Sequence, residues 1–421
     1  MSIFPIITIT FIAGLTRFIT KTWISPGAFF SLCWSFFLIV PIIFAPDYQT
    51  DHLALWFITI FTMALAAGSI IAYSNNSNQL DSNCEYFVQN INYKLLFYAL
   101  LLFCAISSIG LYFLFQYATN KYILNNYYSN WMLIPSMIAI DRYSGVLDYP
   151  FLIKYSLYLI YPANLLGGIL FGQIKNSRKI KIFSFLPLFL AILLGIIESS
   201  RTSILLGLVL FFSAWLSTLM YKWQFMNIHK SFFKIALKSG FFLVVFTVFF
   251  ILIQWLRQGM DTIIIELMID RISAYFFGYL AAFSKWLVLD SELNYSSGFI
   301  TLAGPFNLMG IIDRPLGFYN SIQIANGVST NIFTAFRGII SDFTIPGAIL
   351  IAFSIGFFSQ TIFQSIIKKT LFRMLPISMF YAFTLYSPLI SIFHYNSIFF
   401  SWFIILFILV LASYESVDNY S

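Results

Sequence analysis

Arg201 is the residue whose surroundings most clearly favour a chemical role. It and the nearby Glu198 are the only charged residues in the 40 residues from 182 to 221, a stretch long and apolar enough for two membrane spans. An ionisable residue at such depth is a candidate for a functional site, and Glu198 is a candidate substrate-binding residue beside it. The structural alternative is an arginine that extends to the lipid headgroups and pairs with Glu198.

Two further arginines have polar or interfacial neighbours. Arg337 follows Asn331 and Thr334 and precedes Asp342, so the polar side chains of this segment can share one face of a helix. Such a face is either a headgroup-facing surface or part of a substrate site. Arg257 stands beside a tryptophan at the end of an expected span, where an arginine is often only an interfacial anchor.

A transfer reaction at these arginines also needs a general base for the acceptor hydroxyl. His394 is the favoured candidate, because it is expected near the arginines at the end of a span. A histidine in that place is otherwise an interfacial hydrogen-bonding group. Asp51, in the first expected outer loop, is its rival.

The guanidinium groups suit a lipid-linked diphosphate as substrate. Arginine binds phosphate oxygens bidentately, and it can offset the charge that develops on a diphosphate leaving group when a glycosidic bond breaks. Such a substrate supplies its own activation. The sequence contains no glycine-rich nucleotide loop, no HExxH, no pair of CxxC motifs and no GxSxG elbow. We therefore predict neither a metal site nor a cofactor.

The composition identifies the elements that must position these residues. Of the 421 residues, 60% are hydrophobic and 9% are charged, whereas about 25% are charged in a soluble domain. Apolar runs of about 20 residues, the length of a helix that crosses the hydrocarbon core, recur along the chain. The prediction is an all-α, polytopic helical bundle that forms one transmembrane domain, 1–421. We expect 11 spans, at about 3–19, 26–45, 52–73, 94–115, 151–172, 180–197, 202–221, 234–255, 344–364, 372–391 and 397–413.

The distribution of basic residues orients this bundle. Lysine and arginine cluster in three loops, which the positive-inside rule places in the cytoplasm: 175–181, 222–238 and 368–373. The segments 116–150 and 256–343 then lie outside, and the second forms an 88-residue extracytoplasmic subdomain between spans 8 and 9. The net charge of the chain is +7, and its basic residues lie in short loops between apolar runs and not along one exposed face, so nucleic acid is not a predicted partner.

An amphipathic helix is expected within the second outer segment. Aromatic and aliphatic residues recur every three or four positions between 271 and 289, with polar residues between them. This spacing is typical of a helix that lies at the lipid surface. An ordinary helix packed on the bundle is the alternative.

Two segments of the sequence resemble the O-antigen polymerases of the Wzy type, which polymerise oligosaccharide repeat units. They are residues 198–203, followed by an apolar span, and residues 330–337, followed by 341–347. The layout of the chain is also similar, from the segment 25–27 that opens the second span to the long outer loop late in the sequence. In that family a glycine usually follows the aspartate and phenylalanine, where this sequence has Thr344.

The resemblance implies a fold similar to the GT-C glycosyltransferases and a metal-independent, inverting transfer at the periplasmic face of a bacterial inner membrane. The growing glycan would pass from its undecaprenyl diphosphate carrier to the next lipid-linked repeat unit. Arg201 and Arg257 would bind diphosphates, Arg337 a diphosphate or the acceptor, and His394 would act as base. The implied partners are undecaprenyl-diphosphate-linked glycans, membrane lipid, a chain-length regulator and a flippase.

Other functions fit the same sequence. An O-antigen ligase uses the same donor but passes the finished glycan to the lipid A core, and the sequence separates it poorly from a polymerase. A lipid-linked oligosaccharide flippase, which is a transporter, should have about twelve or more evenly spaced spans and internal duplication. The long segment 256–343 argues against it. A structural membrane protein remains if the arginines face lipid.

Overall fold

The computed structural model describes most of the chain, in two compact units. The described residues are 3–77, 92–124, 134–144, 146, 149–174, 177–223, 248, 251–252, 255, 265–289, 296–313, 319–366 and 373–414. Unit 1 contains Met1–Gln89 and Ser273–Phe399, and unit 2 contains Asn90–Ile272 and Phe400–Ser421.

Ten helices within the described residues are long and apolar enough to cross a membrane, which confirms the predicted class of an α-helical, polytopic membrane protein. The span expected at 372–391 is instead a shorter helix, α15 (Met374–Tyr386), of 13 residues. It ends there because Pro388 has no backbone N–H with which to continue a helix. The span expected at 234–255 lies almost entirely outside the described residues.

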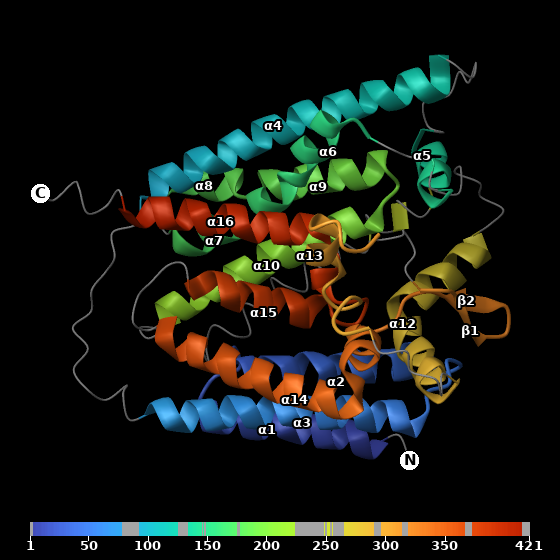
Figure 1. The fold of residues 1–421 in the computed structure, drawn as a ribbon, viewed down its shortest axis with the longest axis vertical. Helices are drawn as coiled ribbons and strands as arrows, with labels where there is room; N and C mark the ends of the chain where they lie inside the picture. The colour runs from blue at the N-terminus through green and yellow to red at the C-terminus, as the bar shows by residue number, and fades with distance from the viewer. Residues whose placement is uncertain are drawn as a thin grey trace, which may run out of the picture. The chain divides into compact units, whose positions relative to one another are not determined.

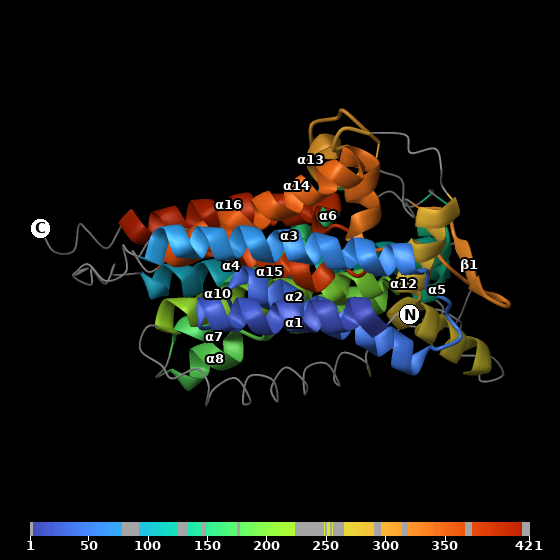
Figure 2. The ribbon, with the colours of Figure 1, turned by 90° about the horizontal axis from the view of Figure 1, so that it is seen from below.

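Unit 1 consists of long helices that run side by side, with a small β-hairpin at one end (Figure 1, Figure 2). Its elements are α1 (Ile3–Thr20), α2 (Pro26–Phe44), α3 (His52–Ser77), α13 (Ala303–Leu308), β1 (Ile322–Ala325), β2 (Val328–Thr330), α14 (Ala335–Ile366), α15 and the 3-10 helix η4 (Ile392–His394). The strands are antiparallel, with Ile322 opposite Thr330 and Ala325 opposite Val328. The all-α prediction did not include this hairpin.

The closest helix pair of unit 1 is α3 with α14, and glycines make their approach possible. A Cβ atom on Gly68 would lie 2.2 Å from the carbonyl oxygen of Phe353, and one on Gly356 would lie 2.0 Å from that of Leu65. Small residues allow this kind of backbone contact between membrane helices, where dispersion replaces the hydrophobic effect as the attraction. The pair therefore depends on the two glycines.

A buried polar chain joins α2, α3 and α14 beside this contact. Gly27 donates its backbone N–H to the hydroxyl of Ser69 at 3.2 Å, and Ser69 donates to the amide oxygen of Gln360 at 3.0 Å. Ser69 and Gln360 are fully buried. Hydrogen bonds of this kind fix the register of helices whose apolar faces are otherwise interchangeable.

The helix α12 (Ile265–Leu289) packs against the turn between α2 and α3. The Tyr279 hydroxyl donates to the carbonyl of Phe37 near the end of α2, and the backbone N–H of Asp51 donates to Ser284. Figure 1 shows α12 inclined steeply to α1, α2 and α3, beside the hairpin. Residues 280–284 are buried, so the alternative of a helix packed on the bundle holds for this part.

Residues 270–289 also satisfy the length and composition of a membrane span. If α12 crossed the membrane together with the expected span at 234–255, the basic loop at 368–373 would face the side opposite to the basic loop at 222–238. That arrangement contradicts the positive-inside rule. A position at the lipid surface stays the prediction for this helix.

Unit 2 is built around α7 and α10. Its elements are α4 (Tyr93–Thr119), the π-helix η1 (Asn120–Leu124), α5 (Ile134–Tyr143), α6 (Phe151–Tyr158), α7 (Ile160–Gln173), α8 (Arg178–Phe183), α9 (Leu186–Ile197), α10 (Arg201–Trp223) and most of α16 (Asn396–Tyr414). A Cβ atom on Gly168 of α7 would lie 2.2 Å from the carbonyl oxygen of Phe211 on α10. These two helices therefore pack closely near the middle of α10.

Candidate functional site

The turn between α9 and α10 positions Arg201 in unit 2. The backbone N–H of Ser200 donates to the carbonyl of Gly195 at 2.8 Å, and that of Ser199 donates to Ile196 at 3.2 Å. These two bonds form a Schellman motif, with Ser199 left-handed at φ 50°. Residues 198–200 thus reverse the chain, and Arg201 is the first residue of α10. The expected hinge is this turn.

Glu198, at the end of α9, is held by an arginine from another helix. Arg142 of α5 donates through Nη2 to the backbone carbonyl of Glu198 at 2.5 Å, and the same nitrogen lies 3.5 Å from Glu198 Oε2. Burial raises the pKa of the Glu198 carboxyl, and the Arg142 charge and the Tyr149 hydroxyl oppose this rise. The α9 end therefore carries a carboxylate whose ionisation depends on Arg142.

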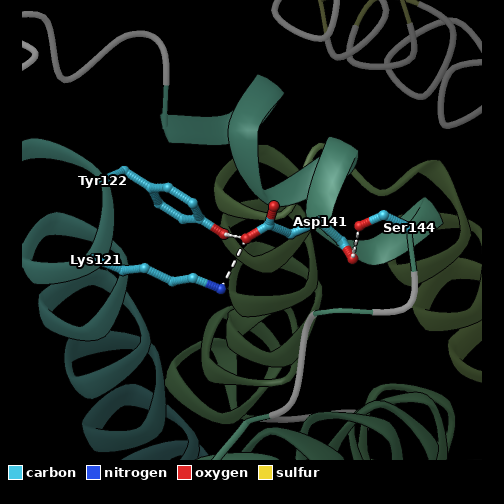
Figure 3. A network of polar contacts seen from close by, with 4 residues as sticks. All are labelled: Lys121, Tyr122, Asp141 and Ser144. Carbon is cyan, nitrogen blue, oxygen red and sulfur yellow. Dashed lines mark hydrogen bonds and ion pairs between the residues drawn. The ribbon is translucent and has the colours of Figure 1, made fainter. Parts of the chain in front are cut away.

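A second polar network fixes α5 on the end of α4 (Figure 3). Both Lys121 Nζ and the Tyr122 hydroxyl lie 2.7 Å from Oδ2 of Asp141, and Ser144 donates to the Asp141 carbonyl at 3.0 Å. The hydrogen bonds from Lys121 and Tyr122 lower the pKa of Asp141. Asp141 directly precedes Arg142, so this network determines where Arg142 lies.

Apolar contacts support the same docking of α5. Tyr122 forms a buried cluster with Ala118 of α4 and with Ile134 and Ile138 of α5, and Ile197 of α9 packs against it. The sequence predictions placed residues 116–150 outside the membrane but selected no functional residue there. The available signal was the adjacent pair of opposite charges, Asp141 and Arg142, in a mostly apolar segment.

In unit 1, Arg337 lies on a short helical segment that precedes a break in α14. Thr344 has φ 67° and ψ 171°, which separates the first part of α14 from the long part that continues to Ile366. This backbone conformation is almost restricted to glycine. The sequence has a threonine at this position, and its backbone adopts a conformation that favours glycine.

The guanidinium of Arg337 is packed among aromatic rings. Its Cζ atom lies 4.0 Å from the ring centre of Tyr319, 4.1 Å from that of Phe333 and 5.2 Å from that of Trp286. Each contact is within the range of cation–π attraction, which is worth about 0.5 to 2 kcal/mol. Of these three aromatic residues, only Phe333 is close enough in sequence, four residues before Arg337, for helical spacing to predict the contact.

Asp342, a predicted substrate-binding residue, makes structural hydrogen bonds. Its carboxylate accepts from the Ser296 hydroxyl, from the backbone N–H of Ile300 at 3.1 Å and from that of Thr301 at 2.6 Å. It is 4% exposed. The carboxylate thus holds the segment before α13 against α14, and substrate could reach it only if these bonds opened.

His394 lies in η4, in the same unit as Arg337. Ala335, the first residue of α14, donates its backbone N–H to the carbonyl of Ser387 at 2.7 Å. Ser387 directly follows α15, in the segment that leads to η4. Gly304 of α13 lies against the backbone of Phe393, since a Cβ atom there would be 2.8 Å from its carbonyl oxygen. These backbone contacts bring the segments that carry Arg337 and His394 into the same part of unit 1. The His394 side chain is buried there, with 4% of its surface exposed.

The other predicted residues differ in their surroundings. Asp51 is exposed, and its Oδ1 accepts from the backbone N–H of Leu53 at 2.8 Å, at the start of α3. Asn331 is exposed, whereas Thr334 is fully buried. Arg257 lies outside the described residues.

Comparison with protein-family models, with curated proteins and with solved structures finds no match to this chain.

Proposed function

We propose that the protein is a membrane glycosyltransferase that polymerises undecaprenyl-diphosphate-linked oligosaccharide repeat units into O-antigen or a related surface polysaccharide. In this proposal it has a GT-C-like fold in a bacterial inner membrane, and its active site faces the periplasm. It uses no metal ion. A chain-length regulator and a flippase are its proposed protein partners.

The observation that carries the proposal is the packing of Arg337 against three aromatic rings. Aromatic stacking and bidentate binding of phosphate oxygens use different parts of a guanidinium, so the two interactions are compatible. The rings also reduce the rotamer freedom that the side chain would lose on binding. An arginine held in this way suits a large anionic headgroup such as a lipid-linked diphosphate.

The proposed reaction is a direct displacement. A hydroxyl of the acceptor glycan attacks the anomeric carbon of the donor, the bond to the diphosphate breaks with inversion, and His394 accepts the hydroxyl proton. In this proposal Arg201, Arg257 and Arg337 offset the charge of the diphosphates, and Glu198 and Asn331 contact substrate. Thr334 is fully buried, so substrate could reach it only if the structure opened locally. Asp51 is the alternative base.

Arginine variants test the proposal. Arg201→Ala and Arg337→Ala should leave the protein inserted in the membrane but abolish long glycan chains, as measured by gel electrophoresis of the surface polysaccharide. Arg373→Ala is the matched control, because Arg373 donates to Ser365 at the opposite end of α14. Normal chain lengths in either the Arg201 or the Arg337 variant would contradict the proposal.

Deletion of the gene in its host separates the polymerase from the two alternatives. Surface lipopolysaccharide with a single repeat unit identifies a polymerase. Bare core with accumulated long lipid-linked polymer identifies a ligase, and repeat units trapped on the inner leaflet identify a flippase. His394→Ala should impair transfer more than binding of the lipid substrate, and equal losses would move the base to Asp51 or Asp342.

A further inference from the structure

The polar contacts of α5 in unit 2 leave one cation incompletely used. Arg142 has five N–H donors, and the hydrogen bond and ion pair that it makes with described residues both go through Nη2 to Glu198. Its charge also interacts with the hydroxyls of Tyr149 and Tyr122. Its Nε and Nη1 atoms make no hydrogen bond to any residue that the structure describes. The side chain is 16% exposed and that of Glu198 is 13% exposed, so both are partly accessible to a ligand.

We propose that Arg142 is a further diphosphate-binding residue, and that Glu198 is the intramolecular group with which the diphosphate competes for it. This role replaces the direct contact with substrate that the proposed function gives to Glu198. The proposal rests on the proposed function for its substrate class. No comparable role was predicted for Arg142 from the sequence. Arg201, three residues after Glu198 in the sequence, is the first residue of α10.

The distances indicate which contact of Arg142 is fixed and which is exchangeable. The bond to the Glu198 carbonyl, at 2.5 Å, is short and ties the guanidinium to the backbone. The carboxylate oxygen, at 3.5 Å, is well beyond the 2.7–2.9 Å of a charge-assisted hydrogen bond. A phosphate that binds bidentately to the guanidinium edge would displace this long contact without disturbing the carbonyl bond.

The neighbouring network explains how Arg142 keeps its position while its partner changes. Asp141, the residue before Arg142, is held by Lys121 and Tyr122. These contacts do not involve Glu198, so they persist when the carboxylate moves away. The result is an arginine that is rigidly placed and only partly neutralised, which is the arrangement that favours anion binding over a purely structural ion pair.

Opposite effects of the two partners test the proposal. The full-length protein in detergent micelles is titrated with undecaprenyl diphosphate, and its Kd is measured for Arg142→Gln and Glu198→Gln. Loss of a charge-assisted hydrogen bond should raise the Kd of the Arg142 variant by roughly 10- to 100-fold. Removal of the competing charge should lower the Kd of the Glu198 variant by about threefold or more.

A structural ion pair gives a different pattern, in which both substitutions weaken binding or neither does. Unchanged affinity in the Arg142 variant overturns the assignment, and unchanged or weaker affinity in the Glu198 variant overturns the competition. If Arg142→Gln does not fold, Arg142→Lys retains the charge without the fork and should still raise the Kd. Lys154→Gln, at an exposed lysine of unit 2, is the control for a general charge effect and should leave the Kd unchanged.

The source of the diphosphate is tested in parallel with inorganic pyrophosphate. Arg142-dependent binding of either probe supports the site, and dependence with the lipid probe alone identifies the membrane as the source. Because neither probe carries a glycan, the assay is independent of polymerisation. A protein that binds diphosphate through Arg142 but makes no polymer would refute the proposed function and leave this inference standing.

Discussion

Thr344 is the position at which backbone strain can be measured most directly. Its φ of 67° and ψ of 171° place a β-branched residue in a region that is almost restricted to glycine. We predict that Thr344→Gly is more stable than Thr344→Ala, although alanine is normally the better residue in a helix. The comparison uses two small side chains that both lack the threonine hydroxyl, so that only the Cβ atom differs.

The magnitude follows from three contributions. Relief of the strained conformation is worth about 1–3 kcal/mol, and the greater unfolded-state freedom of glycine costs about 0.5–1 kcal/mol. Both variants lose the hydrogen bond from Gly347 N–H to Thr344 Oγ1, which at 3.4 Å is long and cancels in the comparison. The difference between these contributions spans about 0–2.5 kcal/mol. From the middle of that range, we expect the glycine variant to exceed the alanine variant by about 1 kcal/mol in free energy of unfolding.

The assay is equilibrium unfolding in mixed micelles of mild detergent and sodium dodecyl sulfate, followed by circular dichroism. Thr361 provides a matched pair of controls, since it lies within the same helix and donates to the carbonyl of Phe357 at 2.9 Å in regular helical geometry. There the order should reverse, with alanine more stable than glycine by about 1 kcal/mol. Equal stabilities at 344, or the same order at both positions, would refute the strained conformation.

Two other predictions concern packing and ionisation. Gly68→Ala should reduce the free energy of unfolding by about 1–3 kcal/mol, because its Cβ would lie 2.2 Å from a backbone oxygen; Gly14→Ala, which meets no atom within 4 Å, should cost nothing. Asp141→Asn should destabilise the protein by about 0.5–1 kcal/mol at neutral pH. Because the folded pKa of Asp141 is lowered, this contribution exists above its unfolded pKa and is lost as the pH falls through its folded pKa, so unfolding of the wild type and the variant should converge in acid.

The spans could be predicted from the sequence because the hydrocarbon thickness sets one length for every crossing helix. Apolar runs of that length stand out at Ile3–Thr20 and at Asn396–Ser413. The same rule overestimated the helix at 372–391, since an apolar run reports hydropathy and not where a helix ends. Its end at Tyr386 depends on Pro388, which a hydropathy pattern does not weigh.

The candidate site was less predictable because its contacts join distant segments. Arg201 and Glu198 could be recognised from two charges in an apolar run, which is a local signal. Arg142 reaches Glu198 across 56 positions of sequence, and that contact exists only because Asp141 fixes α5 on another helix. Likewise, Trp286 and Tyr319 reach Arg337 through the packing of separate segments that no helical spacing indicates.

Each unit holds an arginine through contacts with neutral groups, which are aromatic rings at Arg337 and a backbone carbonyl at Arg142. In unit 1, neutral rings surround Arg337, and Asp342, the acidic residue nearest to it in the sequence, directs its carboxylate to Ser296, Ile300 and Thr301. In unit 2, a backbone carbonyl makes the short contact to Arg142, while the carboxylate remains at 3.5 Å. A carboxylate in close contact would neutralise the guanidinium. An anionic ligand would then have to displace that carboxylate, and this displacement would reduce the free energy of binding. Positioning by neutral groups avoids that cost, and this argument supports the proposal that the two arginines bind phosphate.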